Sequence, residues 1–581
     1  MSIPRPEYPR PGAVREKWMN LNGAWDYVTD NGNSGYARGL AEGKPEDFKG
    51  KITVPFCRES VLSGIGDIDY CFTSWYRREV EFPGDWLENG NRVLLHVGAC
   101  DYRADVFVNG KLAGTHTGGY SSFTVDLTDF LADGKGLLVI HAEDYSKDDH
   151  QPRGKQSNNY ASAGCFYTRT TGIWQTVWCE CVPAAHIVTT KFYPDIHKKT
   201  LCAEVFTCGA VDGLTVKATA TYHGKTVGMD TAVIEKSRAV LTIALDELHL
   251  WDVGKPELYD LVLTVGDDTL TSYFGMRSIG LVDGILYLND RPVFQRLVLD
   301  QGFYPDGIYT APTDEALKGD ILRSMEMGFN GARLHEKVFE ERFLYYCDTL
   351  GYIVWGEFPN WGANIGADYG WGAILPEWLE VLKRDFNHPA IIGWCPLNET
   401  QPNTQDSFTR MLAGLTRAYD PTRLYIDASG WVHSDGVTDI YDLHCYEQDS
   451  EKFRKEWLEP NGGENTPDLH CLNPGQPCRK PFTFVSEYGG TWWAPEAGEA
   501  GWGYGETPKA PDEVVARFRG LTEALLNDPK MGGLCYTQLT DVEQEVNGLY
   551  TYDRRPKFDV SNFRRVLSTP AASETARGKK D

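Results

Sequence analysis

Two glutamates in the second half of the chain each close a short apolar stretch. Glu399 follows residues 391–397, and Glu487 follows residues 482–486. Apolar runs of this length are typical of buried strands, so each carboxylate is expected at the rim of a sheet or barrel. Two rim carboxylates suit the hydrolysis of a glycosidic bond: one holds a proton for the leaving oxygen, and the other meets the positive charge that develops at the sugar carbon.

The two carboxylates need opposite environments. Glu399 can act as an acid at neutral pH only if burial or a neighbouring negative charge raises its pKa. Glu487 must stay ionised to attack, so it needs hydrogen-bond donors or a cation. Arg333 and Tyr446, at the ends of two other predicted strands, are candidate donors to Glu487. Asn398 is placed to bond a sugar hydroxyl next to the reacting carbon; a turn cap is the alternative interpretation.

Further side chains follow predicted strands and are candidates for contacts with a sugar. Packing within a loop explains each of them equally well. The polar candidates are Asp300, His335, Glu357, His444 and Asp541, and the aromatic candidates are Trp361, Trp431, Trp492 and Trp493. The Trp492-Trp493 pair comes shortly after Glu487, close enough to form a platform for a sugar ring.

The elements that must position these residues alternate between short apolar strands and helical patterns. Strands are predicted at 292–299, 330–335, 352–358, 390–397, 423–428, 441–446, 481–487 and 532–540. Helices are predicted from Thr313 and over 338–347, 377–386, 407–418 and 512–527. Such alternation predicts a (β/α)8 TIM barrel, with its active site at the carboxyl ends of the strands. Glu399 then follows strand four and Glu487 ends strand seven, on opposite sides of the barrel mouth.

The residues before the barrel form two other units. Residues 1–184 contain short alternating strands and an Asn109-Gly110 hairpin signal, which favours a jelly-roll β-sandwich. Residues 185–278 contain short strands at regular intervals, which favours an immunoglobulin-like β-sandwich. Residues 279–570 form the catalytic barrel, and residues 571–581 are expected to be a frayed tail.

Composition narrows the classes of partner. The 581-residue chain has a net charge of −25, which disfavours nucleic acid and suits a neutral sugar better than a polyanion. Its 14 cysteines are scattered without zinc spacing, as expected of reduced thiols in the cytoplasm. No signal peptide or membrane-spanning run is recognised. The expected partner is a small oligosaccharide or glycoside, with no nucleic acid and no membrane, and homo-oligomers remain open.

Short motifs extend over nearly the whole chain. They are Leu21-Asn22-Gly23-Ala24-Trp25, Trp75-Tyr76-Arg77-Arg78, Val106-Phe107-Val108-Asn109-Gly110, Gly118-Gly119-Tyr120, Thr171-Gly172-Ile173-Trp174-Gln175, Phe274-Gly275-Met276-Arg277, Gly328-Phe329-Asn330, Ala332-Arg333, 348–351, His388-Pro389, Asn398-Glu399 and Glu487-Tyr488-Gly489. With these motifs the chain resembles glycoside hydrolase family two, which contains β-galactosidases, β-glucuronidases and β-mannosidases. The resemblance implies a sugar-binding jelly roll, an immunoglobulin-like domain and a catalytic barrel. It also implies that Glu399 is the acid/base, that Glu487 is the nucleophile and that configuration is retained.

The sequence departs from the family after three of the predicted barrel strands. Many β-galactosidases of the family carry metal ligands in Glu-x-x-x-Glu-x-His after strand three, whereas Glu357 precedes Phe-Pro-Asn-Trp, so no magnesium or other cofactor is expected. A frequent His-Glu pair after strand one is replaced by residues 299–303, Leu-Asp-Gln-Gly-Phe. Family β-glucuronidases bind the substrate carboxylate with Asn-x-Lys after strand eight, but residues 543–550 contain no lysine and are acidic. A different cation could replace it: Arg296, Lys337, Arg554 or Arg555.

The sequence therefore predicts a retaining exo-β-glycosidase, β-galactosidase-like, that acts through a covalent glycosyl-enzyme. A β-uronidase, either galacturonidase or glucuronidase, is the alternative on the same scaffold. A non-catalytic carbohydrate-binding protein is the alternative of another class. The retaining mechanism predicts carboxyl groups ~5–5.5 Å apart.

Overall fold

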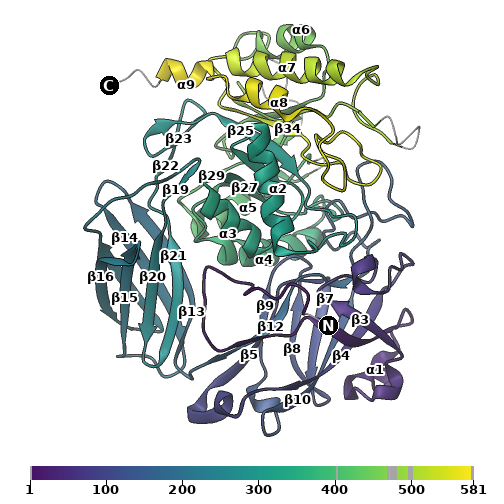
Figure 1. Ribbon diagram of the computed structural model, residues 1–581, viewed down its shortest axis with the longest axis vertical. Coiled ribbons are helices and arrows are strands. Elements are labelled where there is room, and N and C mark those ends of the chain that lie inside the picture. Colours follow the sequence, from purple (N-terminus) through teal and green to yellow (C-terminus); the bar gives the residue numbers. More distant parts are fainter. Residues whose placement is uncertain (1–2, 401–403, 467–469, 472–479, 495–500, 578–581) are drawn as a thin grey trace.

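The computed structural model describes residues 3–400, 404–466, 470–471, 480–494 and 501–577. Two β-sandwiches precede a barrel, and Figure 1 shows both sandwiches packed against it. The predicted fold class is confirmed. The division of the chain at residues 184 and 278 stays a prediction.

The first sandwich is formed by a four-stranded and a six-stranded antiparallel sheet. The smaller contains β1 (Trp18–Asn20), β12 (Val177–Val182), β5 (Arg92–Val97) and β9 (Phe123–Asp126), in that order. The larger contains β3 (Gly50–Val54), β2 (Gly23–Thr29), β4 (Thr73–Glu81), β10 (Lys135–Glu143), β7 (Arg103–Val108) and β8 (Lys111–Thr117). The predicted hairpin joins β7 to β8, and Asn109 and Gly110 have φ of 50° and 78°, as a type I′ turn requires.

The second sandwich packs a three-stranded sheet on a four-stranded sheet. Its strands are β13 (His186–Asp195), β14 (Thr200–Cys208) and β17 (Arg238–Ala244), then β16 (Lys225–Val233), β15 (Thr215–Tyr222), β20 (Tyr259–Val265) and β21 (Asp268–Phe274). Buried and exposed residues alternate strictly along β17, whose Leu241 lies in the same buried core as Leu201 of β14 and Leu261 of β20. This period of two is the reason that the sequence pattern identified the strands.

All eight predicted barrel strands are present. They are β25 (Gln295–Asp300), β26 (Gly331–Leu334), β27 (Ile353–Glu357), β28 (Ile391–Cys395), β29 (Leu424–Tyr425), β31 (Asp442–Cys445), β33 (Phe484–Gly489) and β34 (Gly533–Thr537). They form one parallel sheet in the order β29-β28-β27-β26-β25-β34-β33-β31. Between β29 and β31 the Asp439 amide donates to the Tyr425 carbonyl at 2.8 Å, and the Ser429 hydroxyl donates to Asp442 at 2.6 Å. Contacts outside the strand ladder thus join the ends of the curled sheet.

Helices on the outside of the barrel follow its strands. They are α2 (Asp314–Met327), α3 (Glu341–Leu350), α4 (Asp368–Asp385), α5 (Asp406–Tyr419), α7 (Pro511–Asn527) and α8 (Val560–Leu567). The Thr313 hydroxyl caps α2, as predicted, by accepting from the Ala316 amide. Helix α4 begins nine residues before its predicted start. The pattern was weak there because two glycines and Pro376 lower helix propensity, and burial of Ile374 and Trp378 compensates.

The expectation of a frayed tail is wrong for residues 572–577, which form helix α9 (Ala572–Arg577). Its Glu574 carboxylate accepts from Arg296 at 2.8 Å and from the Phe294 amide at 3.0 Å. Residues 578–581 lie outside the described residues. No helix among the described residues is long and apolar enough to cross a lipid bilayer.

Candidate active site

The carboxyl ends of the barrel strands bring most of the predicted site residues together. Arg333 of β26 is buried at the centre of this group. Its guanidinium donates to Glu487 of β33 at 3.0 Å, to Glu357 of β27 at 2.6 Å and to the Asn398 side chain at 3.2 Å. One fixed planar cation therefore sets the positions of three acceptors on three neighbouring segments.

Glu487 is buried and surrounded by donors. The Tyr446 hydroxyl donates to Oε2, and Arg333 donates to Oε1. Burial alone would raise the pKa of Glu487, but the charges of His444, His335, Arg333 and Lys155 outweigh it and hold the pKa well below its usual range. Glu487 is therefore ionised at neutral pH, as the sequence argument required.

Glu399 follows β28 in an unusual backbone conformation, with φ of 44°. Its amide donates to the Ser429 carbonyl at 2.9 Å, and its Oε1 lies 2.8 Å from His444 Nδ1. A ring nitrogen of His444 and one carboxylate oxygen each of Glu399 and Glu487 all lie within 4.8 Å of one another. The two carboxylates thus face each other with His444 bridging them.

The second buried carboxylate beside Arg333 is Glu357, whose Oε2 lies 3.2 Å from His335 Nδ1. Burial opposes ionisation of Glu357, but Arg333 and His335 lower its pKa. Burial, followed by the charge of Lys155, lowers the pKa of His335. His335 Nδ1 also lies 4.0 Å from Glu487, so this pair borders the nucleophile candidate.

Asn398 has one polar group without a partner among the described residues. Its amide N–H donates to Asn360 at 2.8 Å, its carbonyl accepts from the Trp361 indole at 3.0 Å, and its side-chain oxygen accepts from Arg333. Its buried side-chain nitrogen Nδ2 makes no hydrogen bond. An orphaned donor beside Glu399 fits the predicted contact with a sugar hydroxyl, which stays a prediction.

The first sandwich contributes a cation that the sequence did not indicate. Lys155, in the loop before β11 (Gly172–Ile173), is buried, and its ammonium lies 3.9 Å from the centroid of a Trp361 ring. Burial works against its charge, but Cys165, Glu545, Glu487 and Glu399 outweigh burial and raise its pKa. Among the described residues Lys155 has no ion pair within 4.0 Å.

The only sequence signal for this loop is Gly154. Its φ is 56°, and a Cβ there would lie 2.5 Å from the Glu336 carbonyl of the barrel. A glycine is therefore needed for the close approach of this loop to the barrel segment at Glu336. A second missed residue is Tyr504, whose ring stacks on Tyr446 with centroids 3.5 Å apart.

Other predicted residues lie apart from the glutamate pair. Asp300 accepts from the Gly302 amide at 2.9 Å, and burial and Asp320 raise its pKa to about 7. Asp541 pairs with Lys557 at 2.8 Å. Trp492 and Trp493 are half-buried, and Trp431 is exposed. None of these five contacts Glu399 or Glu487 by a hydrogen bond among the described residues, so their proposed contacts with a sugar stay predictions.

The four cations suggested as alternative carboxylate ligands have partners elsewhere. Lys337 donates to the carbonyls of Gly302 and Tyr309 at 2.5 and 2.8 Å. The remaining three form ion pairs: Arg296 with Glu574, Arg554 with Asp320 and Arg555 with Asp553. The charges of these three arginines are thus compensated by carboxylates of the fold.

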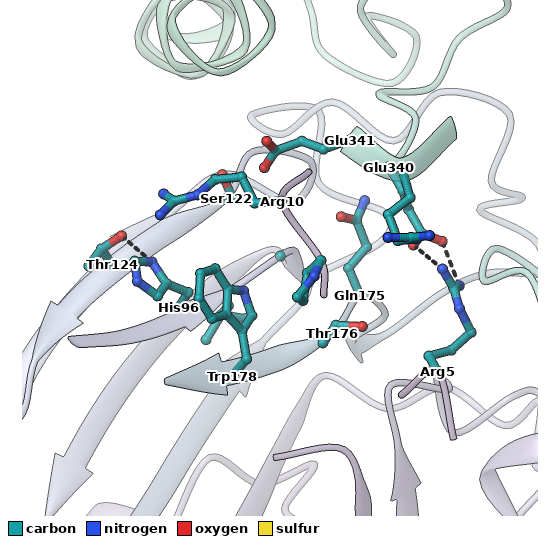
Figure 2. A pocket seen from close by; sticks show the side chains of 14 residues that line it. Arg5, Arg10, His96, Ser122, Thr124, Gln175, Thr176, Trp178, Glu340 and Glu341 are labelled. Carbon is teal, nitrogen blue, oxygen red and sulfur yellow. Dashed lines mark hydrogen bonds and ion pairs between the residues drawn. The ribbon is translucent and has the colours of Figure 1, made fainter. Parts of the chain in front are cut away.

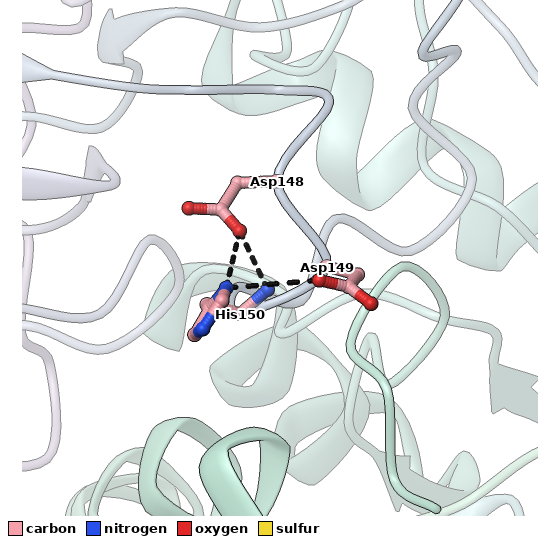
Figure 3. Close-up of side chains that lie close together, drawn as sticks. All are labelled: Asp148, Asp149 and His150. Atoms are coloured by element: carbon pink, nitrogen blue, oxygen red, sulfur yellow. Dashed lines mark hydrogen bonds and ion pairs between the residues drawn. The ribbon is translucent and has the colours of Figure 1, made fainter. Parts of the chain in front are cut away.

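Two groups among the described residues have spacing that could hold a metal ion. One is the Glu399–His444–Glu487 group, where Arg333 and the Tyr446 hydroxyl already bind Glu487. The other is Asp148, Asp149 and His150 on an exposed loop (Figure 3), where His150 Nδ1 lies 2.6 Å from Asp148. Exposed acidic clusters of this kind are common without an ion, so neither group is assigned a metal.

A pocket with a volume of about 60 Å³ lies between the first sandwich and the start of α3 (Figure 2). Arg5 pairs with Glu340 at 2.8 Å, and Arg10 pairs with Glu180 at 3.0 Å. Its lining includes none of the residues around Glu399 and Glu487. Both of these arginines thus have acidic partners at this junction.

A parallel eight-stranded barrel with two facing carboxylates at its mouth is an arrangement that suits glycoside hydrolysis. Comparison with known proteins gives the family. Residues 66–173 match the sugar binding domain of glycosyl hydrolases family 2, residues 185–277 match a second model described as glycosyl hydrolases family 2, and residues 311–473 match the family's TIM barrel domain. Together they cover more than half of the chain, which belongs to glycosyl hydrolases family 2. The predicted family is confirmed.

Relatives within the family carry two different names. A β-galactosidase of Thermoanaerobacter pseudethanolicus is 26% identical over 402 residues, which are 65% of this chain and 51% of that protein. A β-glucuronidase of Sus scrofa is 24% identical over 501 residues, 75% of this chain and 72% of that protein. The chain spans about half the length of the first curated relatives it matches. A β-glucuronidase structure from Ruminococcus gnavus, in complex with N1-substituted uronic isofagomine, superposes with a TM-score of 0.78 at 19% identity, over 97% of this chain and 100% of that one.

Proposed function

We propose that the chain is a retaining exo-β-glycosidase that removes a terminal β-linked sugar from the non-reducing end of a glycoside. The observation that carries the proposal is the approach of Glu399 and Glu487, with ligand oxygens within 4.8 Å across the barrel mouth. Retaining glycosidases place their carboxyl groups ~5–5.5 Å apart, and inverting enzymes ~6.5–9.5 Å apart. The short separation supports a covalent glycosyl-enzyme rather than direct attack by water.

The proposed mechanism has two steps. In the first, ionised Glu487 forms a bond to the anomeric carbon while the bond to the leaving oxygen breaks and Glu399 gives that oxygen a proton. In the second, Glu399 takes a proton from water, whose oxygen displaces Glu487. Arg333 and Tyr446 hold Glu487 in place, and the free Asn398 amide is available to a sugar hydroxyl.

The loop from the first sandwich supports action at a chain end. Lys155 lies over Trp361, and the Tyr167 hydroxyl donates to Glu545 of the loop after β34 at 2.6 Å. These contacts join the sandwich to the rim at two points. A wall on this side of the mouth would admit one terminal sugar and exclude a continuing chain.

For the sugar, a β-galactosidase-like specificity is the first candidate. The similarity to the β-galactosidase of Thermoanaerobacter pseudethanolicus supports it. The acidic loop after β34 supports it as well, because Glu543 and Glu545 would repel an anionic substituent.

A β-uronidase is the second candidate, and Lys155 is the observation that favours it. The Lys155 side chain is buried and makes no ion pair among the described residues, and Glu487 and Glu399 are among the groups whose charges raise its pKa, so its ammonium is available to a carboxylate on the substrate. Neutralisation of that charge would offset part of the cost of burying the lysine. The relatives named β-glucuronidase are consistent with this candidate.

A panel of 4-nitrophenyl β-glycosides tests both the glycosidase activity and the choice of sugar. The panel contains the galactoside, galacturonide, glucuronide, mannoside and arabinoside. Turnover of at least one is expected, with Glu487→Gln slower by at least ~10³-fold and the exposed control Glu235→Gln unchanged. Unchanged turnover by Glu487→Gln would contradict the nucleophile assignment. Binding of the sugars without turnover of any glycoside would support the non-catalytic alternative.

A further inference from the structure

A buried arginine without an acidic partner lies where the second sandwich meets the base of the barrel. Arg277, three residues after β21, is 6% exposed and forms no ion pair within 4.0 Å among the described residues. Its Nε donates to the Pro389 carbonyl at 2.5 Å, and its Nη2 donates to the Ile391 carbonyl at 3.1 Å. A guanidinium has five N–H donors. Three of those of Arg277, including both on Nη1, therefore have no acceptor in the described part of the chain.

The neighbouring Arg423 is fully hydrogen-bonded. Its five N–H donors have five acceptors, which are the carbonyls of Phe386, His388 and Ile391, the Thr422 hydroxyl and the Asp420 carboxylate. The Ile391 carbonyl thus accepts from both arginines, which brings the two guanidiniums together at one oxygen. Asp420 pairs with Arg423 at 2.7 Å. Two adjacent buried cations are therefore served by one carboxylate.

The charge of Arg277 is not balanced by its surroundings. Burial and the charge of Arg423 lower the pKa of Arg277 to about 9, and the charges of Asp420 and Asp348 offset them only in part. Asp348 is itself paired with His388 at 2.5 Å. Burial of a charge without an opposite charge beside it costs free energy. An anion beside Arg277 would lower that cost.

A pocket with a volume of about 270 Å³ adjoins the two arginines. Sites for drug-sized ligands measure roughly 300–1,000 Å³, so this pocket suits a smaller molecule. The polar residues of its lining are Arg277, Ser278, Asn387, Thr422 and Arg423. None of the described residues that line it is an aspartate or a glutamate, and aromatic rings and prolines form most of the remaining lining. The pocket therefore offers positive charge and apolar surface to a ligand.

We propose that this pocket is a binding site for a small oxyanion, a carboxylate or a phosphate, which the free N–H groups of Arg277 bind. Arg277 comes from the end of the second sandwich, and the other polar groups come from the segments just before β28 and β29, so the anion would join the sandwich to the barrel. The pocket lies at the amino ends of the barrel strands, whereas Glu399 and Glu487 lie at the carboxyl ends. The site is thus separate from the proposed active site, and the inference does not depend on the proposed function.

Calorimetric titration of the purified chain with sodium phosphate and with sodium benzoate tests the site, and sodium chloride at equal ionic strength is the control. We expect one oxyanion per chain to bind with a Kd below about 1 mM. The thermal unfolding midpoint should rise by at least about 1 °C at about 20 mM of that anion. Tighter binding of phosphate would identify a phosphate ligand, and tighter binding of benzoate would identify a carboxylate with an apolar body.

Two variants of the pocket decide whether the binding occurs there. Arg277→Gln should weaken binding of the anion at least ~10-fold, because it removes the charge and the free N–H groups. Ser278→Asp keeps Arg277 but adds a carboxylate to the lining, so it should also weaken binding, and it decides the matter if Arg277→Gln does not fold. Arg238→Gln is the control, because it changes an arginine of the second sandwich that is half exposed and pairs with Glu204, and it should bind like the wild type.

The inference is overturned if neither anion gives binding heat or a midpoint shift beyond that of sodium chloride. It is also overturned if an anion binds but Arg277→Gln and Ser278→Asp both bind it as tightly as the wild type.

Discussion

Arg333 Nη1 lies 3.0 Å from Glu487 Oε1, and both side chains are buried. The same guanidinium neutralises Glu357 at 2.6 Å. One cation therefore compensates two buried carboxylates. Loss of Arg333 would leave both of them uncompensated, so it should cost more stability than the loss of either ion pair alone.

Arg333→Met should reduce both activity and stability. It leaves Glu357 and Glu487 without their cation, and breaking a buried pair in this way costs about 3–5 kcal/mol. The thermal midpoint should fall by several degrees, and kcat/KM should fall by at least ~10²-fold. The exposed pair Arg555–Asp553 provides the control, because Arg555→Met should change neither quantity measurably.

Tyr446→Phe removes one donor to Glu487 without changing the packing volume much. We expect kcat to fall ~10²-fold, as for other lost donors at reacting oxygens. Donors and cations lower the pKa of Glu487, so the loss of a donor must raise it. The acidic limb of the pH profile of kcat/KM should therefore move to higher pH. An unmoved acidic limb would contradict the assignment of Glu487 as the group that must be ionised.

Lys155 separates the two candidate specificities. If the substrate is a uronide, Lys155→Gln should lower kcat/KM on that uronide by ~10²-fold or more and change the neutral glycosides by less than about threefold. Lys155→Arg should retain part of the uronide activity, because it keeps the charge. Equal effects of Lys155→Gln on charged and neutral sugars would show that the lysine supports the loop and does not select the substrate.

Glu377 of α4 makes the stability of the junction between sandwich and barrel depend on pH. It is buried, its Oε1 accepts from the amides of Tyr120 and Ser121 at 2.6 and 3.2 Å, and burial raises its pKa to about 8. The folded chain retains a proton that the unfolded chain releases, so stability falls as the pH rises from the ordinary glutamate pKa through 8.

Glu377→Gln removes this dependence while keeping an acceptor for both amides. Thermal unfolding should give the variant a midpoint about 1–3 °C above wild type at pH 9 and no advantage at pH 5. A variant that is destabilised equally at both pH values would show that the carboxyl group has no titration linked to folding.

The eight barrel strands were predictable because each is a short buried run, and parallel strands covered on both faces are apolar throughout. Glu399 and Glu487 were predictable for the same reason, since each directly follows such a run. Their contact partners Arg333, Tyr446 and His444 also end strands. A residue at a strand end has its place in the barrel fixed by the order of strands alone.

Lys155 and Tyr504 were not predictable in this way. Lys155 lies in an irregular loop of the first sandwich, and its place near Glu399 depends on how that sandwich packs on the barrel. The four cations suggested as ligands of a substrate carboxylate have partners elsewhere, for a different reason. Lys337 follows strand two closely in sequence, yet its ammonium turns to the carbonyls of Gly302 and Tyr309. Sequence position fixes the backbone at a strand end but not the direction of a long side chain beyond it.

Trapping of the covalent intermediate tests the central claim most directly. The enzyme would be incubated with a 2-deoxy-2-fluoro aryl β-glycoside of the preferred sugar, digested, and mapped by peptide mass spectrometry. A single added sugar on Glu487, with loss of activity in proportion to labelling, is the predicted result. A sugar attached to another residue, or steady turnover that gives the α-anomer first with no labelled peptide, would contradict it.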